Sequence, residues 1–249
     1  MVILSNDLGL AFCKLGDSSW TTLEDNDNPG LLLTPTDLAY SSEDQLFYCT
    51  DSYSDSDLDA WNLRNPCSPR RIDIKAGLVY GTPDYPESEK KLRNYSSLIQ
   101  YRNYLAMESH SGDVLLVKRF VAGAADDGTI IDTDNSDHGQ NFSFKTLRFD
   151  VSRFNTTKRG WDYVTDLGDG VLFVGLNHAF HLSATDFAPG VLIPNSIYFN
   201  VDVRMRCDDI GIYNMQDFTI KSIFPSHLHP FNNIWLPTPI WFTPNPENK

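Results

Sequence analysis

The stretch that decides the fold spans residues 161–203 and reads WDYVTDLGDGVLFVGLNHAFHLSATDFAPGVLIPNSIYFNVDV. Its last part, from Ile197 onwards, alternates strictly between apolar and polar residues, which predicts a strand with one buried face. The residues expected to face the interior are Ile197, Phe199, Val201 and Val203. Those expected to be more exposed are Tyr198, Asn200 and Asp202.

Two further runs in this stretch also have the pattern of strands. Residues 171–176 are apolar on both faces and too short for a helix, so they predict an inner strand. Residues 179–183 form the next run, and the Pro189-Gly190 turn follows. Three strands within about 35 residues predict a meander, which needs neighbouring strands to bury its faces.

The same stretch resembles a known family. Leu167-Gly-Asp-Gly-Val-Leu-Phe-Val-Gly-Leu-Asn-His178, Ser183-Ala-Thr-Asp-Phe187 and Pro194-Asn-Ser-Ile-Tyr-Phe199 are similar, in this order, to segments of the plant KIB-type β-propeller domain. That domain stands mostly at the C-terminal end of F-box proteins. The resemblance implies an all-β fold, an antiparallel β-propeller of roughly four to six blades.

The N-terminal part continues the strand pattern and the resemblance. Residues 8–23 predict two strands around a Gly16–Ser19 turn, and the runs 37–40, 45–50 and 58–63 predict further strands. Phe12-Cys-Lys-Leu-Gly-Asp-x-x-Trp20 and Asp59-Ala-Trp-Asn-Leu63 are again similar to the family. Trp20 and Trp61 are about 40 residues apart, the spacing expected for one propeller blade.

The middle and C-terminal parts predict more strands and two inserted loops. The runs 104–109 and 113–120 predict a hairpin with a Ser-His-Ser-Gly turn, 144–151 a further strand, and 209–213 with 218–224 a last hairpin. The polar segments 81–95 and 121–141 are predicted to be loops inserted into a single propeller domain over residues 1–249.

The two chain ends bear on how a propeller would close, since propellers close by joining the ends within one blade. The tail Pro237–Pro244 resembles the family's closing segment. If Met1 is the true start, the strands that precede Leu8 in the family are missing together with the F-box, and we expect an incomplete propeller of marginal stability. The alternative is that Leu8–Leu23 pairs with Ile240–Phe242 and closes a smaller ring.

Composition narrows the possible partners and the compartment. The net charge of −13 argues against nucleic acid and against an anionic membrane surface as partners. No apolar run reaches the ~18 residues of a spanning helix, and the first residues do not have the pattern of a signal peptide. Cys13, Cys49, Cys67 and Cys207 have no CxxC spacing. We therefore expect reduced thiols and a location in the cytoplasm, the nucleus or both.

Several groups of residues resemble ligand sites without meeting their requirements. Asp55-Ser-Asp57-Leu-Asp59 begins like a calcium loop, but Ala60 and Pro66 stand where an EF-hand needs Gly and Glu. His178 and His181 are expected on opposite faces of a strand, and His227 with His229 has no acidic or thiol neighbour in sequence. We expect no metal and no cofactor.

An acidic pair and the tryptophans are the candidates for catalysis and for recognition. Asp208-Asp209 is the one adjacent acidic pair beside a late strand, and a sugar hydrolase needs two converging carboxylates. Blade-edge acids are more often solvated, so no catalytic residue is assigned. The tryptophans Trp20, Trp61, Trp161 and Trp241 are expected mainly in the core. One of them, or Trp235, is the alternative contact residue.

The leading hypothesis is a non-enzymatic protein-binding module. The resemblance implies the substrate-recognition part of plant F-box proteins in cullin-RING ubiquitin ligases, with binding and inhibition of a signalling kinase as a variant. Direct binding to the ligase adaptor is not expected without an F-box. The alternative is a carbohydrate-active hydrolase, which would show converging carboxylates, whereas a binding module would show exposed aromatic residues on a loop face.

Overall fold

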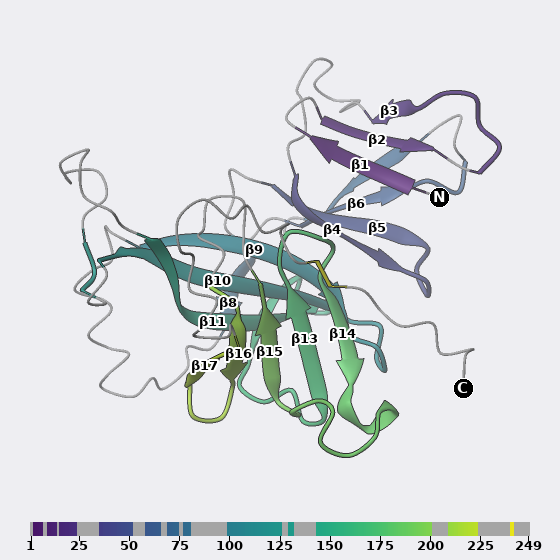
Figure 1. Cartoon of the computed structure of the whole chain (residues 1–249). Helices are drawn as coiled ribbons and strands as arrows, with labels where there is room; N and C mark the ends of the chain where they lie inside the picture. The colour runs from purple at the N-terminus through teal and green to yellow at the C-terminus, as the bar shows by residue number, and fades with distance from the viewer. Residues whose placement is uncertain are drawn as a thin grey trace. The chain divides into compact units, whose positions relative to one another are not determined.

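The computed structural model shows an all-β protein (Figure 1). The structure describes residues 2–6, 9–13, 15–23, 35–51, 58–65, 69–74, 77–80, 99–125, 129–131, 143–200, 209–223 and 240–241. No α-helix occurs within these ranges, and the one helical turn is the short 3-10 helix η2 (Ala184–Asp186). The prediction of an all-β fold is confirmed.

The described strands form four sheets, none of which closes on itself (Figure 1). The first is β1 (Val2–Asn6), β2 (Gly9–Cys13) and β3 (Thr21–Leu23). The second is β4 (Pro35–Ser41), β5 (Leu46–Asp51), β6 (Leu58–Asn62) and β7 (Arg70–Asp73). The third runs in the order β8 (Gly77–Tyr80), β12 (Gly160–Val164), β11 (Ser143–Asn155), β10 (Val114–Ala124) and β9 (Ile99–Met107). The fourth runs in the order β14 (Phe180–Ser183), β13 (Gly170–Val174), β15 (Ser196–Phe199), β16 (Gly211–Asn214) and β17 (Ile220–Ser222).

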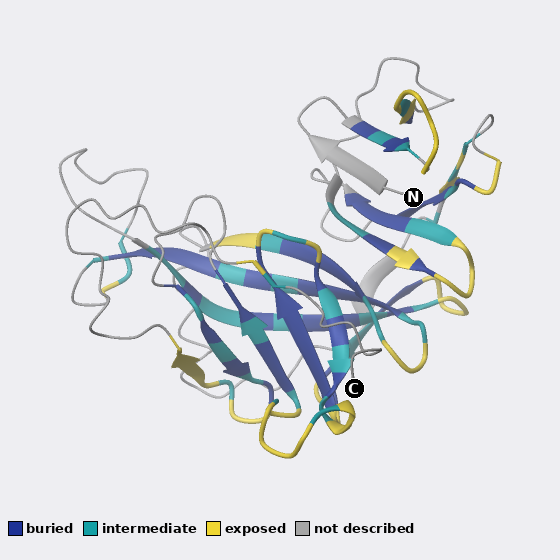
Figure 2. Ribbon diagram, turned by 45° about the vertical axis from the view of Figure 1, so that its right-hand side comes forward, coloured by how far each residue is buried: buried dark blue, intermediate teal, exposed yellow. Residues whose placement is uncertain are grey.

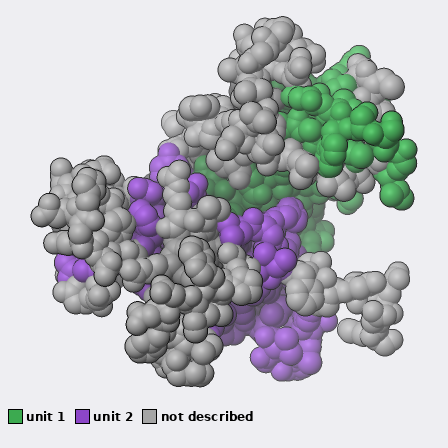
Figure 3. All heavy atoms as spheres, turned by 45° about the horizontal axis from the view of Figure 1, so that its top comes forward, with its two compact units in different colours: residues 1–82, 103–117, 151–163 green, residues 83–102, 118–150, 164–249 purple. Residues whose placement is uncertain are grey.

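The chain divides into two compact units (Figure 3). Unit 1 holds residues 1–82, 103–117 and 151–163, and unit 2 holds residues 83–102, 118–150 and 164–249. The number of blades and the single domain over residues 1–249 stay predictions.

Unit 1 has two apolar clusters. One surrounds Trp161 and also contains Ala39, Tyr48, Leu58, Ala60, Leu105, Val114, Leu116 and Phe154. The other surrounds Trp61 and contains Leu10, Phe12, Leu23, Cys49 and Leu63. Both tryptophans are buried, as expected for core residues.

Asp37 of β4 places a carboxyl group inside unit 1. Its Oδ1 accepts from the backbone N–H of Leu38 and its Oδ2 from that of Leu105, each at 2.8 Å. The residue as a whole is half-buried, but burial of the carboxyl group raises its pKa to about 7 despite these two donors. The effect of burial on the pKa exceeds that of the two N–H donors, because burial removes water from the charged form of the carboxyl group.

This pKa makes the stability of the protein depend on pH. Between about pH 4 and pH 7 the folded state binds a proton at Asp37 that the unfolded chain has released. The contribution of this proton to the free energy of unfolding is therefore fully present below pH 4 and is lost as the pH rises to about 7. In urea unfolding, the wild type should lose at least about 1.4 kcal/mol more than Asp37→Asn between pH 5 and pH 8, the equivalent of one pKa unit. Equal pH dependence in the two proteins would contradict the prediction.

In unit 2, β13 is an inner strand that lies between β14 and β15, and this corrects the predicted meander. β13 is buried along its whole length (Figure 2), pairs antiparallel with β14 and pairs parallel with β15. The chain passes through η2 and returns to the opposite edge of β13. There Asn195 fixes the return: its side-chain oxygen accepts from the Leu167 N–H and its N–H donates to the Gly170 carbonyl. The apolar inner strand and its antiparallel pairing with β14 agree with the prediction, whereas β15 pairs with β13 and not with β14 as a meander requires.

The alternation from Ile197 onwards is only partly confirmed. Ile197 and Phe199 are buried and Tyr198 is half-buried, as expected, whereas Asn200 is completely buried. β15 ends at Phe199, so the period of two no longer applies at Asn200. Val201, Asp202 and Val203 lie outside the described residues.

Asn200 fills space that only a glycine leaves open. A Cβ atom on Gly175 would overlap with Asn200 Oδ1 and lie 2.5 Å from its Cγ. Gly175→Ala should therefore lower the free energy of unfolding by about 1–3 kcal/mol, as measured by urea unfolding. The double variant Gly175→Ala/Asn200→Ala should regain part of this loss, and a single variant as stable as the wild type would refute the clash.

Other strand predictions have mixed outcomes. The hairpins β2–β3, β9–β10 and β16–β17 and the strands β4, β5 and β6 are confirmed. β1, β7, β8 and β12 were not predicted, and residues 121–124 belong to β10 rather than to the inserted loop 121–141. Loop 81–95 lies outside the described residues.

Candidate protein-interaction site

Two hairpin turns of unit 1 lie beside each other. The β4–β5 turn covers residues 42–45, and the β9–β10 turn covers residues 108–113. A Cβ atom on Gly112 would lie 3.2 Å from Glu43 Oε2, so the backbone of one turn approaches the side chain of the other. Gly112 also has a φ of +71°, which a side chain disfavours.

Each turn is fixed by its own hydrogen bonds. In the first, the Asp44 N–H donates to Ser41 Oγ at 3.1 Å, and the Tyr48 hydroxyl donates to Asp44 Oδ2 at 2.9 Å. Burial raises the pKa of Tyr48 far above its ordinary value, and Asp44 adds to the shift, so this hydroxyl stays a donor at neutral pH. In the second, Ser111 Oγ donates to Glu108 Oε2 at 2.7 Å. Both turns are therefore preformed.

A pocket of about 300 Å³ opens at these turns. It is lined by Tyr40, Ser41, Ser42, Glu43 and the segment from Met107 to Gly112. Tyr40 is 45% exposed, and its ring lies 4.6 Å from that of Phe47, centroid to centroid. Tyr40 and Met107 supply apolar surface, while Glu43 and Glu108 supply carboxylates.

The two carboxylates differ in their surroundings. Arg153 forms ion pairs with Glu108 at 2.8 Å and with Asp113 at 3.4 Å, so the charge of Glu108 is compensated. Glu43 is exposed at the turn, and no ion pair to it occurs in the part of the chain that the structure describes. An aromatic ring beside an exposed carboxylate suits a lysine or arginine side chain, whose stem packs on the ring while its charged end meets the carboxylate.

The tryptophans were expected mainly in the core, with one of them as the alternative contact residue, and they differ in exposure. Trp20 is 46% exposed, and Leu15 on the same β2–β3 loop is fully exposed. Trp61 and Trp161 are core residues, Trp241 is half-buried, and Trp235 lies outside the described residues. The sequence does not indicate Tyr40 as a contact residue, because its strand pattern gives no sign of a neighbouring hairpin turn.

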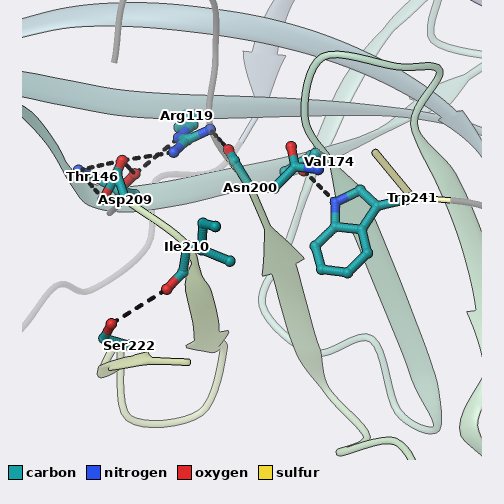
Figure 4. A network of polar contacts seen from close by, with 8 residues as sticks. All are labelled: Arg119, Thr146, Val174, Asn200, Asp209, Ile210, Ser222 and Trp241. Atoms are coloured by element: carbon teal, nitrogen blue, oxygen red, sulfur yellow. Dashed lines mark hydrogen bonds and ion pairs between the residues drawn. The ribbon is translucent and has the colours of Figure 1, made fainter. Parts of the chain in front are cut away.

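Asp209 belongs to a buried polar cluster in unit 2 (Figure 4). Its Oδ2 lies 2.7 Å from Nη2 of Arg119 and also 2.7 Å from the donating Thr146 hydroxyl. Arg119 Nη1 donates to the Asn200 carbonyl at 2.8 Å. The expectation of a solvated blade-edge acid is therefore wrong for Asp209: the carboxylate is held by a structural ion pair. Asp208 lies outside the described residues.

The remaining candidates do not come together as a site. His178 is exposed and His181 is buried, while His227 and His229 lie outside the described residues. Asp59 is a β6 residue whose carboxylate forms an ion pair with Arg71 at 2.7 Å. Asp55 and Asp57 lie outside the described residues. Among the described residues, no three His, Cys, Asp or Glu side chains are grouped to hold a metal ion.

Further findings concern the thiols and the helices. Cys13 and Cys49 are not part of a disulfide, and Cys67 and Cys207 fall in undescribed segments. Within the described ranges, no helix has the length and apolar character needed to cross a membrane.

The fold and the sequence together define the class of protein. The model of the KIB1-4 β-propeller family matches residues 1–214, so the chain belongs to this family. It is similar to the F-box protein SKIP23 of Arabidopsis thaliana, with 29% identity over 106 residues. The match covers 40% of this chain and 25% of that relative. No solved structure matches the chain.

Proposed function

We propose that the chain is a non-enzymatic protein-binding module, which takes part in substrate recognition by ubiquitin ligases of the F-box type. Membership of a β-propeller family and similarity to an F-box protein support this class. The observation that carries it is the preformed pocket at the β4–β5 and β9–β10 turns, with an exposed tyrosine beside an exposed carboxylate. We place the protein in the cytoplasm, the nucleus or both.

The partner that fits this pocket presents a basic side chain. The chain has a net charge of −13, so a basic partner surface is also favoured at long range. A signalling kinase that the module binds and inhibits is one such partner. Asp209, the carboxylate considered for a sugar hydrolase, is held by Arg119, which favours binding over hydrolysis.

Partner capture with purified variants tests the proposal. Tyr40→Ala removes the exposed ring and Glu43→Lys reverses the exposed charge, so each should lower the recovery of cross-linked partner proteins at least tenfold. Asp186→Lys introduces the same charge change at an exposed position of η2 and should leave recovery unchanged. Cross-links should map to residues 40–43 and 107–112.

Two results would count against the proposal. Equal recovery by wild type, Tyr40→Ala and Glu43→Lys would remove the pocket from the binding surface. Failure of the wild type to retain any protein reproducibly would refute the binding module itself.

A further inference from the structure

Three aromatic rings lie side by side on the sheet of unit 2. Phe173 of β13 stands directly opposite Phe180 of β14 and opposite Tyr198 of β15. Its ring centroid lies 4.9 Å from that of Phe180 and 5.0 Å from that of Tyr198, with interplanar angles of 15° and 22°. Directly opposite residues share one face of a sheet, so Phe180, Phe173 and Tyr198 form an aromatic platform.

Trp241 covers this platform. Its ring lies edge-on to Phe173 with centroids 5.3 Å apart, and edge-on to Tyr198 at 6.5 Å. Its indole N–H donates to the Val174 carbonyl at 2.9 Å (Figure 4). A tryptophan can therefore both pack on the apolar rings and donate to the Val174 carbonyl, whereas a phenylalanine has no donor for that carbonyl.

Asn177 pairs with the backbone of the same residue. The Trp241 N–H donates to Asn177 Oδ1 at 3.0 Å, and Asn177 Nδ2 donates to the Trp241 carbonyl at 2.7 Å. One side-chain amide thus binds both backbone groups of one residue, much as a neighbouring strand would. These two bonds do not depend on which protein supplies the backbone.

The elements that hold Trp241 are fixed by other contacts. Phe173 is 7% exposed and is stacked between two rings of its own sheet. The Val174 carbonyl also accepts from the Asn200 N–H at 3.2 Å, and the Tyr198 hydroxyl accepts from the Ile193 N–H at 3.1 Å. A preformed site of this kind loses little conformational entropy on binding.

The bound tail residue is itself only partly enclosed. Trp241 is half-buried and the preceding Ile240 is 64% exposed. Of the two tail residues that the structure describes, one therefore makes the specific contacts.

We propose that Asn177, the Val174 carbonyl and the aromatic platform form a binding site for an extended, tryptophan-bearing segment of a partner protein. Trp241 fills this site in cis. The proposal rests on the protein-binding function but concerns a second site, in unit 2 rather than at the hairpin turns. A partner must compete with Trp241, which belongs to the same chain as the site.

A peptide with the chain's own tail sequence is the probe. The experiment measures binding of a synthetic peptide of residues 236–246, LPTPIWFTPNP, to the full-length chain by fluorescence anisotropy. Trp241→Ala vacates the site and should bind the peptide at least tenfold more tightly than the wild type. The same peptide with Ala in place of Trp should bind at least tenfold more weakly.

Matched variants distinguish peptide binding at this site from nonspecific binding. In the Trp241→Ala background, Asn177→Asp replaces the amide donor by a second acceptor and should weaken peptide binding at least tenfold. Ile220→Ala removes an exposed apolar residue of the same unit, outside the platform, and should leave binding unchanged. If Trp241→Ala does not melt cooperatively, Trp241→Phe keeps a ring, lacks the indole N–H and should also bind the peptide more tightly than the wild type.

Two outcomes would overturn the proposal. One is equal binding of the peptide with and without its tryptophan. The other is a wild-type dimer that excess peptide dissociates, because a second copy of this chain would then be the occupant. Neither outcome bears on the pocket at the hairpin turns, so the proposed function is tested separately.

Discussion

Replacing Arg119 with methionine is expected to lower the free energy of unfolding by about 3–5 kcal/mol. The Arg119 side chain is fully buried, and that of Asp209 is 8% exposed. Methionine keeps much of the length but removes the positive charge, so the Asp209 carboxylate stays buried without its counter-charge. The bond from Arg119 Nη1 to the Asn200 carbonyl is lost as well. Urea unfolding followed by circular dichroism measures the change.

Two further variants identify the cause. Arg119→Met/Asp209→Asn removes both charges while the new amide oxygen can still accept from the Thr146 N–H, so it should be more stable than Arg119→Met alone. Arg153→Met breaks two ion pairs, to Glu108 and Asp113, of an arginine side chain that is 41% exposed, and should cost less than about 1 kcal/mol. Equal losses for Arg119→Met and Arg153→Met would show that burial does not govern this interaction.

Trp161→Ala is expected to lower the free energy of unfolding by about 3–5 kcal/mol, because it leaves a large cavity in the core of unit 1. Trp161 is completely buried, and its ring meets that of Phe154 edge-on with centroids 5.4 Å apart. Trp20→Ala is the matched control. Trp20 is 46% exposed, so its replacement should change stability by no more than about 0.5 kcal/mol.

The same urea unfolding experiment checks both tryptophans. If Trp20→Ala destabilised the protein as much as Trp161→Ala, Trp20 would be a core residue. The assignment of the β2–β3 loop as exposed surface would then be wrong.

The strands that were predicted correctly are those whose signal is local. Alternation placed Ile197 and Phe199 inside, and turn residues around Gly112 placed the β9–β10 hairpin. Both signals depend on neighbours in sequence, because side-chain direction in a strand has a period of two. Asn200 breaks the pattern because the strand ends one residue before it.

The features that were missed depend on residues far apart in sequence. Arg119 and Asp209 are separated by 90 residues, and nothing local distinguishes Asp209 from a solvated acid. The pocket likewise requires two turns from separate hairpins to meet. Parallel pairing of β13 with β15 was missed because the predicted order of strands followed the order in sequence. Tertiary pairing decided each of these outcomes.

The separation of 90 residues between Arg119 and Asp209 also has a consequence during synthesis on the ribosome. At a translation rate of roughly 5–20 residues per second, about 5–20 s pass between the addition of Arg119 and that of Asp209. For that time the guanidinium has no counter-charge from Asp209, so the part of β10 around Arg119 has not reached its final buried environment. Unit 2 therefore completes its core late in translation, and nascent chains stalled before Asp209 should be cleaved by protease within β10.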